Sequence, residues 1–439
     1  MSYVFKMEKG RGGFARVDII TNENGHDFAQ KTYDPQLHLI QAVGDEHLKQ
    51  RFIREVRYQS QINHPNVVKI LEQYLESNPP FFIMPLADCT LKEELDYDPT
   101  LGANLHTALF DILAGLEHIH SLGITHRDLK PANILRYTSS EGKNFYAISD
   151  FGLMSASNSQ SSTLTGTNAN GGTENYAAPE LIGSFRQATP SADIYAFGAI
   201  LHDIFGNSAQ RIPYTELTLP GHIGKIIEKC TKRLPIRRYA SVSILRDELY
   251  QVLNTQPVIF NSSGEEAIVE LLRSGRQLND DEWDTVFIQI ERNLSINQGT
   301  KNILEALSID HIQALKTQTP NLFAAMGSFF SEHILGHSFN FDYCDVLASK
   351  AEYFYEGSGL DLKASIALAL LYLGTSHNRW YVERKAVAML SADISDAQAE
   401  RIRIDIEVHQ IDFSGQIAHT GRSIGFNKAN LHPILLPLA

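Results

Sequence analysis

The segment His126–Asn133 brings together residue types that could transfer a phosphoryl group, and Asp150 follows it after a short gap. Transfer from ATP needs carboxylate and amide oxygens that hold Mg²⁺, and a base beside the attacking hydroxyl. Asp128 is our candidate for the base, and Asn133 and Asp150 are our candidates for metal ligands. Lys130 would neutralise charge on the transferred group. The segment therefore predicts phosphoryl-transfer chemistry.

The same residues resemble two motifs of one known family. His126–Asn133 is similar to the catalytic loop of the eukaryotic-type (Hanks-type) protein kinases, and Asp150-Phe151-Gly152 is similar to their metal-binding turn. A tripeptide alone is too short to carry an argument, so the test is whether the other motifs follow in order. The resemblance implies a two-lobed α+β fold that uses ATP with Mg²⁺, or with Mn²⁺ in its place. By analogy we expect a soluble bacterial enzyme.

The glycine-rich stretch Gly10–Val17 looks like the hairpin with which these kinases cover the nucleotide phosphates. Glycines let backbone N–H groups approach phosphates closely. Ala15 stands where the family has a third glycine, which is a small change because the first two glycines make the closest approach. The nucleotide contacts implied here are those of Gly10, Gly12, Gly13 and Val17.

A lysine and a glutamate complete the phosphate site that the resemblance implies. Lys31 matches the third-strand lysine that holds the α- and β-phosphates, and Ala29 in the same strand is another implied nucleotide contact. The helical pattern Arg51–Val56 offers Glu55 as the ion-pair partner that would hold Lys31 in place.

The stretch Phe81–Ala87 resembles the strand and hinge that bind adenine. Met84 stands in the gatekeeper position, and the backbones of Pro85 and Ala87 would face the base. Pro85 departs from the family's frequent glutamate. Its carbonyl can still accept a hydrogen bond from the adenine amino group, so the departure does not threaten ATP use.

Later motifs keep the family's order. Ala178–Glu180 resembles the end of the activation segment, and Asp193–Gly198 resembles the buried helix that anchors the catalytic loop. Arg238 matches the arginine that family members pair with the glutamate at Glu180. The resemblance thus covers residues 3 to about 253.

Two features favour serine and threonine over tyrosine as the acceptor. Lys130 follows the base by two residues, and Thr173 stands where the serine/threonine branch has a threonine that contacts the base, here Asp128. Arg127 would pair with a phosphate on the activation segment and order it. We therefore predict autophosphorylation within residues 155–173, although this composition is also typical of a solvated loop. The favoured sites are Thr165 and Thr167, ahead of Thr163 and Ser162.

Composition restricts what the chain binds. Its 439 residues are 43% apolar and 20% charged, which is typical of folded domains, and the formal charge of −13 argues against broad binding to nucleic acid backbones. The longest apolar run, near residues 366–373, falls short of the roughly 20 residues that cross a bilayer as a helix. The first residues leave no room for a secretory signal. Three scattered cysteines indicate no disulfide framework, so we expect a cytoplasmic protein.

The length predicts more than one domain, because single hydrophobic cores stop growing near ~250–300 residues. We predict a kinase domain over 1–253 (N-lobe 1–85, C-lobe 88–253), a linker over 254–264 where turn formers collect, and an all-α domain over 265–439. Amphipathic patterns predict helices over Glu265–Ser274 and Asp280–Asn293, the second with Asp280 as its N-cap.

Two groups in the C-terminal half allow a ligand-binding interpretation. His333 and His337 are four residues apart and Cys344 follows, which could indicate a metal site. Such histidines more often pack or lie at the surface, and the H-E-x-x-H pattern is absent. The aromatic-rich stretch 339–355 could form a binding groove, but a helix core is the simpler interpretation.

Together the motifs predict a protein serine/threonine kinase with a helical domain that regulates it or recruits its targets. The alternative is a pseudokinase-like interaction protein in which the kinase half is a nucleotide-gated switch. A further hypothesis is that the helical domain occludes the cleft until a trigger releases it. The expected partners are a protein with a serine or threonine acceptor and a regulator of the C-terminal domain, with no nucleic acid and no membrane. The substrate, the activating signal, the pathway and the oligomeric state stay open.

Overall fold

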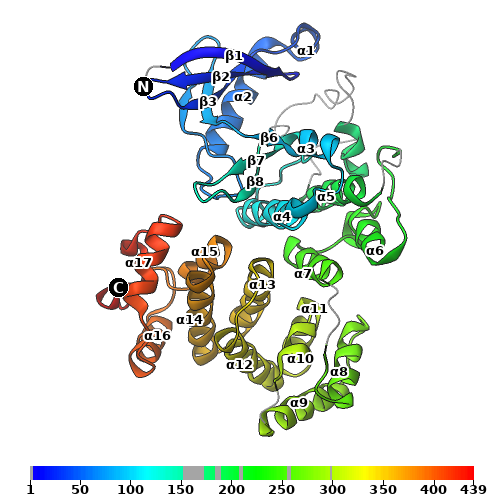
Figure 1. Cartoon of the computed structure of the whole chain (residues 1–439), viewed down its shortest axis with the longest axis vertical. Helices are drawn as coiled ribbons and strands as arrows, with labels where there is room; N and C mark the ends of the chain where they lie inside the picture. Colours follow the sequence, from blue (N-terminus) through cyan, green and yellow to red (C-terminus); the bar gives the residue numbers. More distant parts are fainter. Residues whose placement is uncertain (1–2, 152–172, 183–188, 207–210, 255–258, 297–298) are drawn as a thin grey trace. The chain divides into compact units, whose positions relative to one another are not determined.

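The computed structural model describes residues 3–151, 173–182, 189–206, 211–254, 259–296 and 299–439, and the chain forms two compact units, Met1–Leu245 and Arg246–Ala439 (Figure 1). The first unit contains two β-sheets and several helices. The second unit contains helices and no strand among its described residues. The predicted fold class, α+β followed by all-α, is confirmed.

Five antiparallel strands form the larger sheet, in the order β1-β2-β3-β5-β4. The turn between β2 and β3 has the chemistry of a tight hairpin, because the Asn22 side chain accepts from the backbone N–H groups of Asn24 and His26. In this register Val17 lies opposite Lys31, which lies opposite Phe82. The strands are β1 (Tyr3–Arg11), β2 (Ala15–Asn22), β3 (Asp27–Tyr33), β4 (Glu72–Tyr74) and β5 (Phe81–Pro85).

Helices α1 (Leu37–Val43) and α2 (Asp45–Gln59) follow β3. Helix α2 is amphipathic, and its residues Leu48, Phe52 and Val56, spaced by four, are all buried. Acidic residues in its first turn suit the positive end of the helix dipole. The buried stripe fixes the rotation of α2 and so sets the direction of the candidate site residue Glu55.

The rest of the first unit is mainly helical (Figure 1). Its small antiparallel sheet, in the order β6-β7-β8, carries the catalytic-loop motif just before β7 and Asp150 just after β8. Helix α5 begins at Pro190, where the missing N–H costs no helical hydrogen bond. The elements are β6 (Cys89–Thr90), α3 (Leu91–Tyr97), η1 (Gly102–Asn104), α4 (Leu105–Ser121), η2 (Pro131–Asn133), β7 (Ile134–Thr138), β8 (Asn144–Ile148), η3 (Thr173–Asn175), η4 (Pro179–Leu181), α5 (Pro190–Phe205), α6 (Gly221–Cys230) and η6 (Pro235–Arg237).

Successive helices build the second unit. The predicted helices near 265 and 280 are present, but the predicted N-cap Asp280 is wrong: Asn279 caps α9 by accepting from the backbone N–H of Glu282. None of the described helices is both long and apolar enough to span a membrane. The elements are α8 (Ser263–Arg273), α9 (Asp280–Ser295), α10 (Lys301–Ala306), α11 (Ile309–Gln318), α12 (Pro320–Gly336), α13 (Phe341–Gly357), α14 (Leu360–His377), α15 (Trp380–Ala388), α16 (Asp396–Val408), α17 (Phe413–Ser423), η7 (Lys428–Asn430) and η8 (Leu436–Leu438).

The packing of this half bears on both of its ligand-binding interpretations. No group of three or more histidine, cysteine or acidic side chains among the described residues could hold a metal ion. His333 is buried on α12, its ring is tilted against that of His337 and meets that of Phe339 edge-on, and burial lowers its pKa to about 3. Of the aromatic side chains on helix α13, Tyr343 and Phe354 are buried, whereas Phe341 is about half exposed, so the stretch is core only in part.

Helix α7 (Val242–Leu253) runs across the boundary between the units. The Asp247 carboxylate forms an ion pair with the Lys350 ammonium at 3.1 Å, and both side chains are almost completely buried. Beside it, Arg246 donates to the Ser349 and Tyr381 hydroxyls at 3.1 and 2.6 Å. These polar contacts place residues from Arg246 onward in the second unit, ahead of the predicted domain boundary at residue 253.

We predict that Lys350→Met destabilises the second unit by about 3–5 kcal/mol, because the buried Asp247 carboxylate then has no cation. Both tryptophans, Trp283 and Trp380, lie in this unit, so tryptophan fluorescence during urea unfolding reports on it alone. The control is Lys301→Met, since Lys301 is about half exposed. Equal stabilities of the two variants would contradict a structural role for the buried ion pair.

Candidate active site

Asp193, buried in α5, holds the catalytic loop in place. Its carboxylate accepts hydrogen bonds from the backbone N–H groups of His126 and Arg127 and from His120 Nε2, each at 2.8 Å. Burial alone would raise the pKa of Asp193, but the hydrogen bond and charge of His120 outweigh it and the pKa is lowered. An ionised acceptor strengthens each of these bonds. The predicted role of this helix as anchor of the loop thus agrees with its contacts.

Two site residues have left-handed backbone conformations. Arg127 has a φ of 70° and Asp150 a φ of 58°. Such conformations cost free energy in residues that have a Cβ atom, and they persist only where neighbouring contacts enforce them. For Arg127 that contact is the bond from its own N–H to Asp193. The strained turn directs the next residue, Asp128, into the site.

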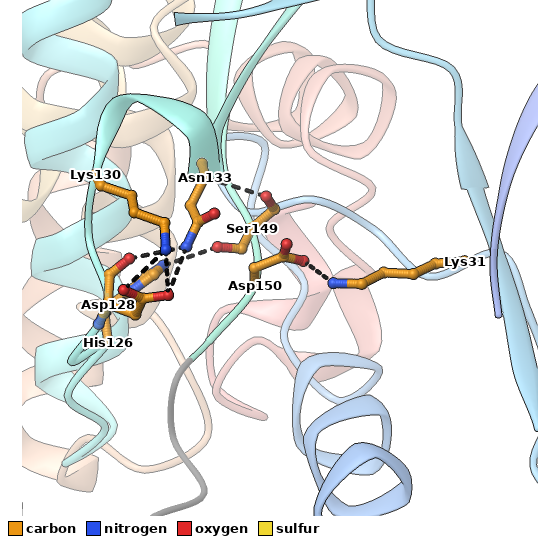
Figure 2. A network of polar contacts seen from close by, with 7 residues as sticks. All are labelled: Lys31, His126, Asp128, Lys130, Asn133, Ser149 and Asp150. Carbon is orange, nitrogen blue, oxygen red and sulfur yellow. Dashed lines mark hydrogen bonds and ion pairs between the residues drawn. The ribbon is translucent and has the colours of Figure 1, made fainter. Parts of the chain in front are cut away.

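Asp128 is the centre of a polar network (Figure 2). Lys130 Nζ lies 3.1 and 2.9 Å from the two carboxylate oxygens of Asp128. Asn133 Nδ2 donates to the Asp128 carbonyl at 2.8 Å and to Oδ2 at 3.1 Å. The structure therefore brings together three of the predicted site residues, from the loop and from η2.

His126 and Ser149 join the loop to the strand that carries Asp150. His126 Nε2 donates to the Ser149 carbonyl at 2.9 Å, and Ser149 N and Oγ donate to the Asn133 carbonyl at 2.8 and 3.0 Å (Figure 2). His126 Nδ1 accepts from Asp128 N at 3.3 Å, so the two ring nitrogens have opposite roles. Burial lowers the pKa of His126, in keeping with this neutral tautomer. Sequence reasoning named neither His126 nor Ser149 as a site residue.

Lys31 forms an ion pair with Asp150 across the site (Figure 2). Burial alone would lower the pKa of Lys31, but the charges of Asp150 and Glu55 outweigh it and the pKa is raised. The pKa of Asp150 is lowered, because the charge and hydrogen bond of Lys31 outweigh the effect of burial. The two groups therefore face each other as ions.

The predicted ion pair between Glu55 and Lys31 is not among the contacts of the described residues. The reason is competition, since the Asp150 carboxylate already binds the Lys31 ammonium directly. Glu55 stays near enough to influence Lys31 electrostatically, while burial raises its own pKa to about 7. The structure thus brings Lys31, Asp150 and Glu55 together, but Lys31 pairs with Asp150 and not with Glu55 as predicted.

An apolar cluster provides the candidate adenine site. Ala29 and Met84 lie opposite each other in β3 and β5, and both are buried in this cluster together with Ala87. Val17 packs against it, as does Leu135 of β7, which sequence reasoning did not name. The position of Leu135 two residues after Asn133 was the signal that could have found it.

The hinge carbonyls already have protein donors. Tyr137 Oη donates to the Pro85 carbonyl at 3.4 Å, and Lys9 Nζ donates to the Ala87 carbonyl at 3.2 Å. A carbonyl oxygen has two lone pairs, so each can still accept a second hydrogen bond.

The turn that joins β1 to β2 is open around its glycines. A Cβ atom added at Gly10 would meet nothing within 4 Å, and none of Gly10, Gly12 and Gly13 has a positive φ. The fold itself therefore does not require glycine at Gly10. A glycine at this position therefore serves best to leave room for a ligand close to the backbone. This agrees with the predicted contact between Gly10 and a phosphate.

A family model described as protein kinase domain matches residues 3–248, more than half of the chain. The chain belongs to the protein kinase family. The resemblance stated from the motifs is confirmed.

Several curated bacterial kinases are similar to this chain. A probable serine/threonine-protein kinase of Streptomyces coelicolor is 27% identical over 275 residues, which are 57% of this chain and 39% of that protein. The serine/threonine-protein kinase PknD of Chlamydia pneumoniae is 30% identical over 260 residues (48% and 27%). The DNA damage-responsive serine/threonine-protein kinase RqkA of Deinococcus radiodurans is 35% identical over 184 residues (39% and 27%). The chain thus spans well under half the length of these relatives.

The end of the kinase activation segment is fixed by the expected ion pair. Arg238 Nη1 and Nη2 each donate to one carboxylate oxygen of Glu180 at 2.7 Å, and the Arg238 side chain is completely buried. This bidentate geometry is the strongest form of an arginine–carboxylate contact. Predicted phosphosites Ser162, Thr163, Thr165 and Thr167, together with Gly152, lie outside the described residues, as does the side chain of Thr173.

We predict that Asp193→Asn slows phosphoryl transfer by roughly 10- to 100-fold, because one strong hydrogen bond to the catalytic loop is lost and an amide group faces N–H donors. The backbone amides of His126 and Arg127 should also exchange with deuterium faster than in the parent protein. Hydrogen-exchange mass spectrometry of the peptide that contains them measures this loss directly. Unchanged exchange would contradict the anchoring role of Asp193.

We also predict that Glu55 makes the stability of the first unit dependent on pH. Its pKa is raised from 4.5 to about 7 on folding. The folded state therefore holds the proton more tightly, so this stabilisation is complete below pH ~4.5 and is lost as pH rises through ~7. Glu55→Gln should remove this loss.

Urea unfolding followed by far-UV circular dichroism between pH 5 and 8 tests that prediction. The midpoint of the parent protein should fall relative to that of Glu55→Gln as pH rises. Parallel pH profiles would contradict it.

Proposed function

We propose that this chain is a protein serine/threonine kinase that transfers the γ-phosphoryl group of ATP to a hydroxyl group of a protein substrate. The observation that carries the proposal is the hydrogen-bonded group of Asp128, Lys130 and Asn133, with Asp150 on the neighbouring strand end. The similar proteins named above are described as serine/threonine kinases, which supports the acceptor class.

Asp128 would take the proton of the attacking hydroxyl. Its Oδ2 accepts from both Lys130 and Asn133, whereas Oδ1 accepts from Lys130 alone. Oδ1 therefore keeps a lone pair for the substrate hydroxyl, in a carboxylate whose orientation is already fixed. Lys130 can in addition neutralise negative charge on the transferred group.

Asn133 and Asp150 have the donor set that Mg²⁺ prefers. The Asn133 amide nitrogen donates to Asp128, which leaves its oxygen as the acceptor for a metal ion. One amide oxygen and one carboxylate suit Mg²⁺, which binds few protein oxygens together with substrate phosphates. When bound, the ion would neutralise charge on those phosphates. We propose Mg²⁺ as the physiological ion and Mn²⁺ as a substitute.

Lys31 must change partners in this mechanism. It is paired with Asp150, and both residues are needed elsewhere, Lys31 at the α- and β-phosphates and Asp150 at the metal. Glu55 is the acid that can then take Lys31, since its charge already acts on the ammonium group. We propose that the observed pairing is a resting arrangement.

The remaining predictions about the cell are part of this proposal. We propose a cytoplasmic location, in keeping with the absence of a disulfide bond at Cys89, Cys230 and Cys344. Autophosphorylation within 155–173 and a regulator of the helical unit are proposed on the sequence alone. Whether the chain forms an oligomer stays open.

Incubation with γ-labelled ATP and Mg²⁺ tests the proposal, with label on protein as the readout. The parent should label itself or a general substrate protein, and Asp128→Ala should reduce the rate by about 10²- to 10⁴-fold, as expected for loss of a general base. The matched control is Asp96→Ala, because Asp96 is an exposed acid of α3 and should not matter.

Equal labelling by the parent and Asp128→Ala would contradict the assigned base. No labelling by either protein, despite measurable ATP binding, would favour the alternative, a nucleotide-gated interaction protein.

A further inference from the structure

Asp34 contacts the glycine-rich turn from outside the nucleotide site. It follows Tyr33, the last residue of β3, and its backbone N–H donates to the Phe14 carbonyl at 3.0 Å. Its Oδ2 accepts from Arg11 Nη2 at 2.5 Å and lies 3.8 Å from Arg16 Nη1. Because Arg11 ends β1 and Arg16 belongs to β2, a single acid joins both sides of the turn that is expected to cover the nucleotide phosphates.

The next residues along the chain extend this contact. Gln36 N donates to the Gly13 carbonyl at 3.0 Å, and Gln36 Nε2 donates to the Gly12 carbonyl at 3.4 Å. Leu39 is buried on α1, and its Cδ1 lies 3.4 Å from the point that a Cβ atom added at Gly13 would occupy. The chain between β3 and α1 thus holds the turn along its length.

The orientation of the turn's peptide groups follows from these bonds. The carbonyls of Gly12, Gly13 and Phe14 face the segment 34–36, which donates to them. In a trans peptide the N–H group points away from the carbonyl of the preceding residue. The N–H groups of Gly13 and Phe14 therefore face the opposite side of the turn.

Charge adds to the role of the Asp34 carboxylate. Arg11 and Arg16 are like charges on the two sides of one short turn, and Asp34 lies close to both. Ion pairs that are partly exposed are individually weak, and about half of the Arg11 side chain and a third of the Asp34 side chain are exposed. Removal of the carboxylate should therefore loosen the turn without unfolding the lobe.

We infer that Asp34 is a positioning residue for the nucleotide phosphates, an inference that rests on the proposed kinase function. It fixes the turn so that the N–H groups of Gly13 and Phe14 are oriented for phosphate oxygens before a nucleotide binds. A turn that is already ordered loses less conformational freedom on binding. Because a carboxylate repels a phosphate, Asp34 acts through the turn and not by direct contact.

Calorimetry of the full chain with MgATP and with adenosine tests the inference. Asp34→Ala should weaken MgATP binding by about three- to tenfold, as expected for the loss of two partly exposed ion pairs. Adenosine binding should stay unchanged, because adenosine has no phosphate group for the turn to bind. Asp34→Glu keeps the carboxylate and should restore part of the MgATP affinity. The matched control is Asp27→Ala, since Asp27 is similarly exposed and pairs with Lys6 at the other end of β3.

Each of the other results would overturn the inference. Tighter MgATP binding by Asp34→Ala would mean that the carboxylate mainly repels the phosphates. Equal losses of affinity for MgATP and adenosine would indicate general damage to the lobe, and affinities that match those of Asp27→Ala would exclude a role of Asp34. These results leave the proposed function standing, whereas a parent chain that binds neither ligand would contradict that function as well.

Hydrogen-exchange mass spectrometry checks the physical cause without any nucleotide. The backbone amides of residues 8–17 should exchange faster in Asp34→Ala than in the parent chain and in Asp27→Ala. Unchanged exchange would contradict the claim that Asp34 orders the turn, even if the MgATP affinity falls. Equal melting temperatures of the variants control for folding.

Discussion

The buried carboxylate of Asp193 is the contact on which the rest of the site depends. It accepts two backbone N–H groups of the catalytic loop and one histidine, and it thereby enforces a left-handed conformation at Arg127 that would otherwise relax. That turn aims Asp128 into the site, where Lys130 and Asn133 orient it. The buried helix α5 therefore positions the catalytic loop, and the loop positions the base Asp128.

Charge balance is the second constraint on the site. Each of the two functional carboxylates is paired with a lysine, Asp128 with Lys130 and Asp150 with Lys31, while Glu55 lies close by with a raised pKa. A site arranged in this way is stable without a ligand, because each of the two functional carboxylates has a cation and the raised pKa of Glu55 favours its neutral form. It must nevertheless rearrange when phosphates and a divalent ion bring new charges, and Lys31 is the group that has to move.

The parts of the site that could be predicted from the sequence are those set by local motifs. The Asp128 group, the Ala29 and Met84 positions and the Glu180–Arg238 pair each follow from residue types at fixed spacing, and their contacts agree with the structure. The partner of Lys31 could not be predicted in this way, because it depends on competition between acids that lie far apart in the sequence. The division of the chain between Leu245 and Arg246 could not be predicted from the sequence either, because the buried ion pair of Asp247 and Lys350 forms only through tertiary packing.

A crystal structure of the chain with Mg²⁺ and a non-hydrolysable ATP analogue tests the central claim most directly. The account predicts a metal ion bound by the Asn133 amide oxygen and the Asp150 carboxylate, the γ-phosphate beside Asp128, and Lys31 moved from Asp150 to the phosphates. A nucleotide bound with Lys31 still paired to Asp150, or a metal ion held without Asn133 and Asp150, would contradict it.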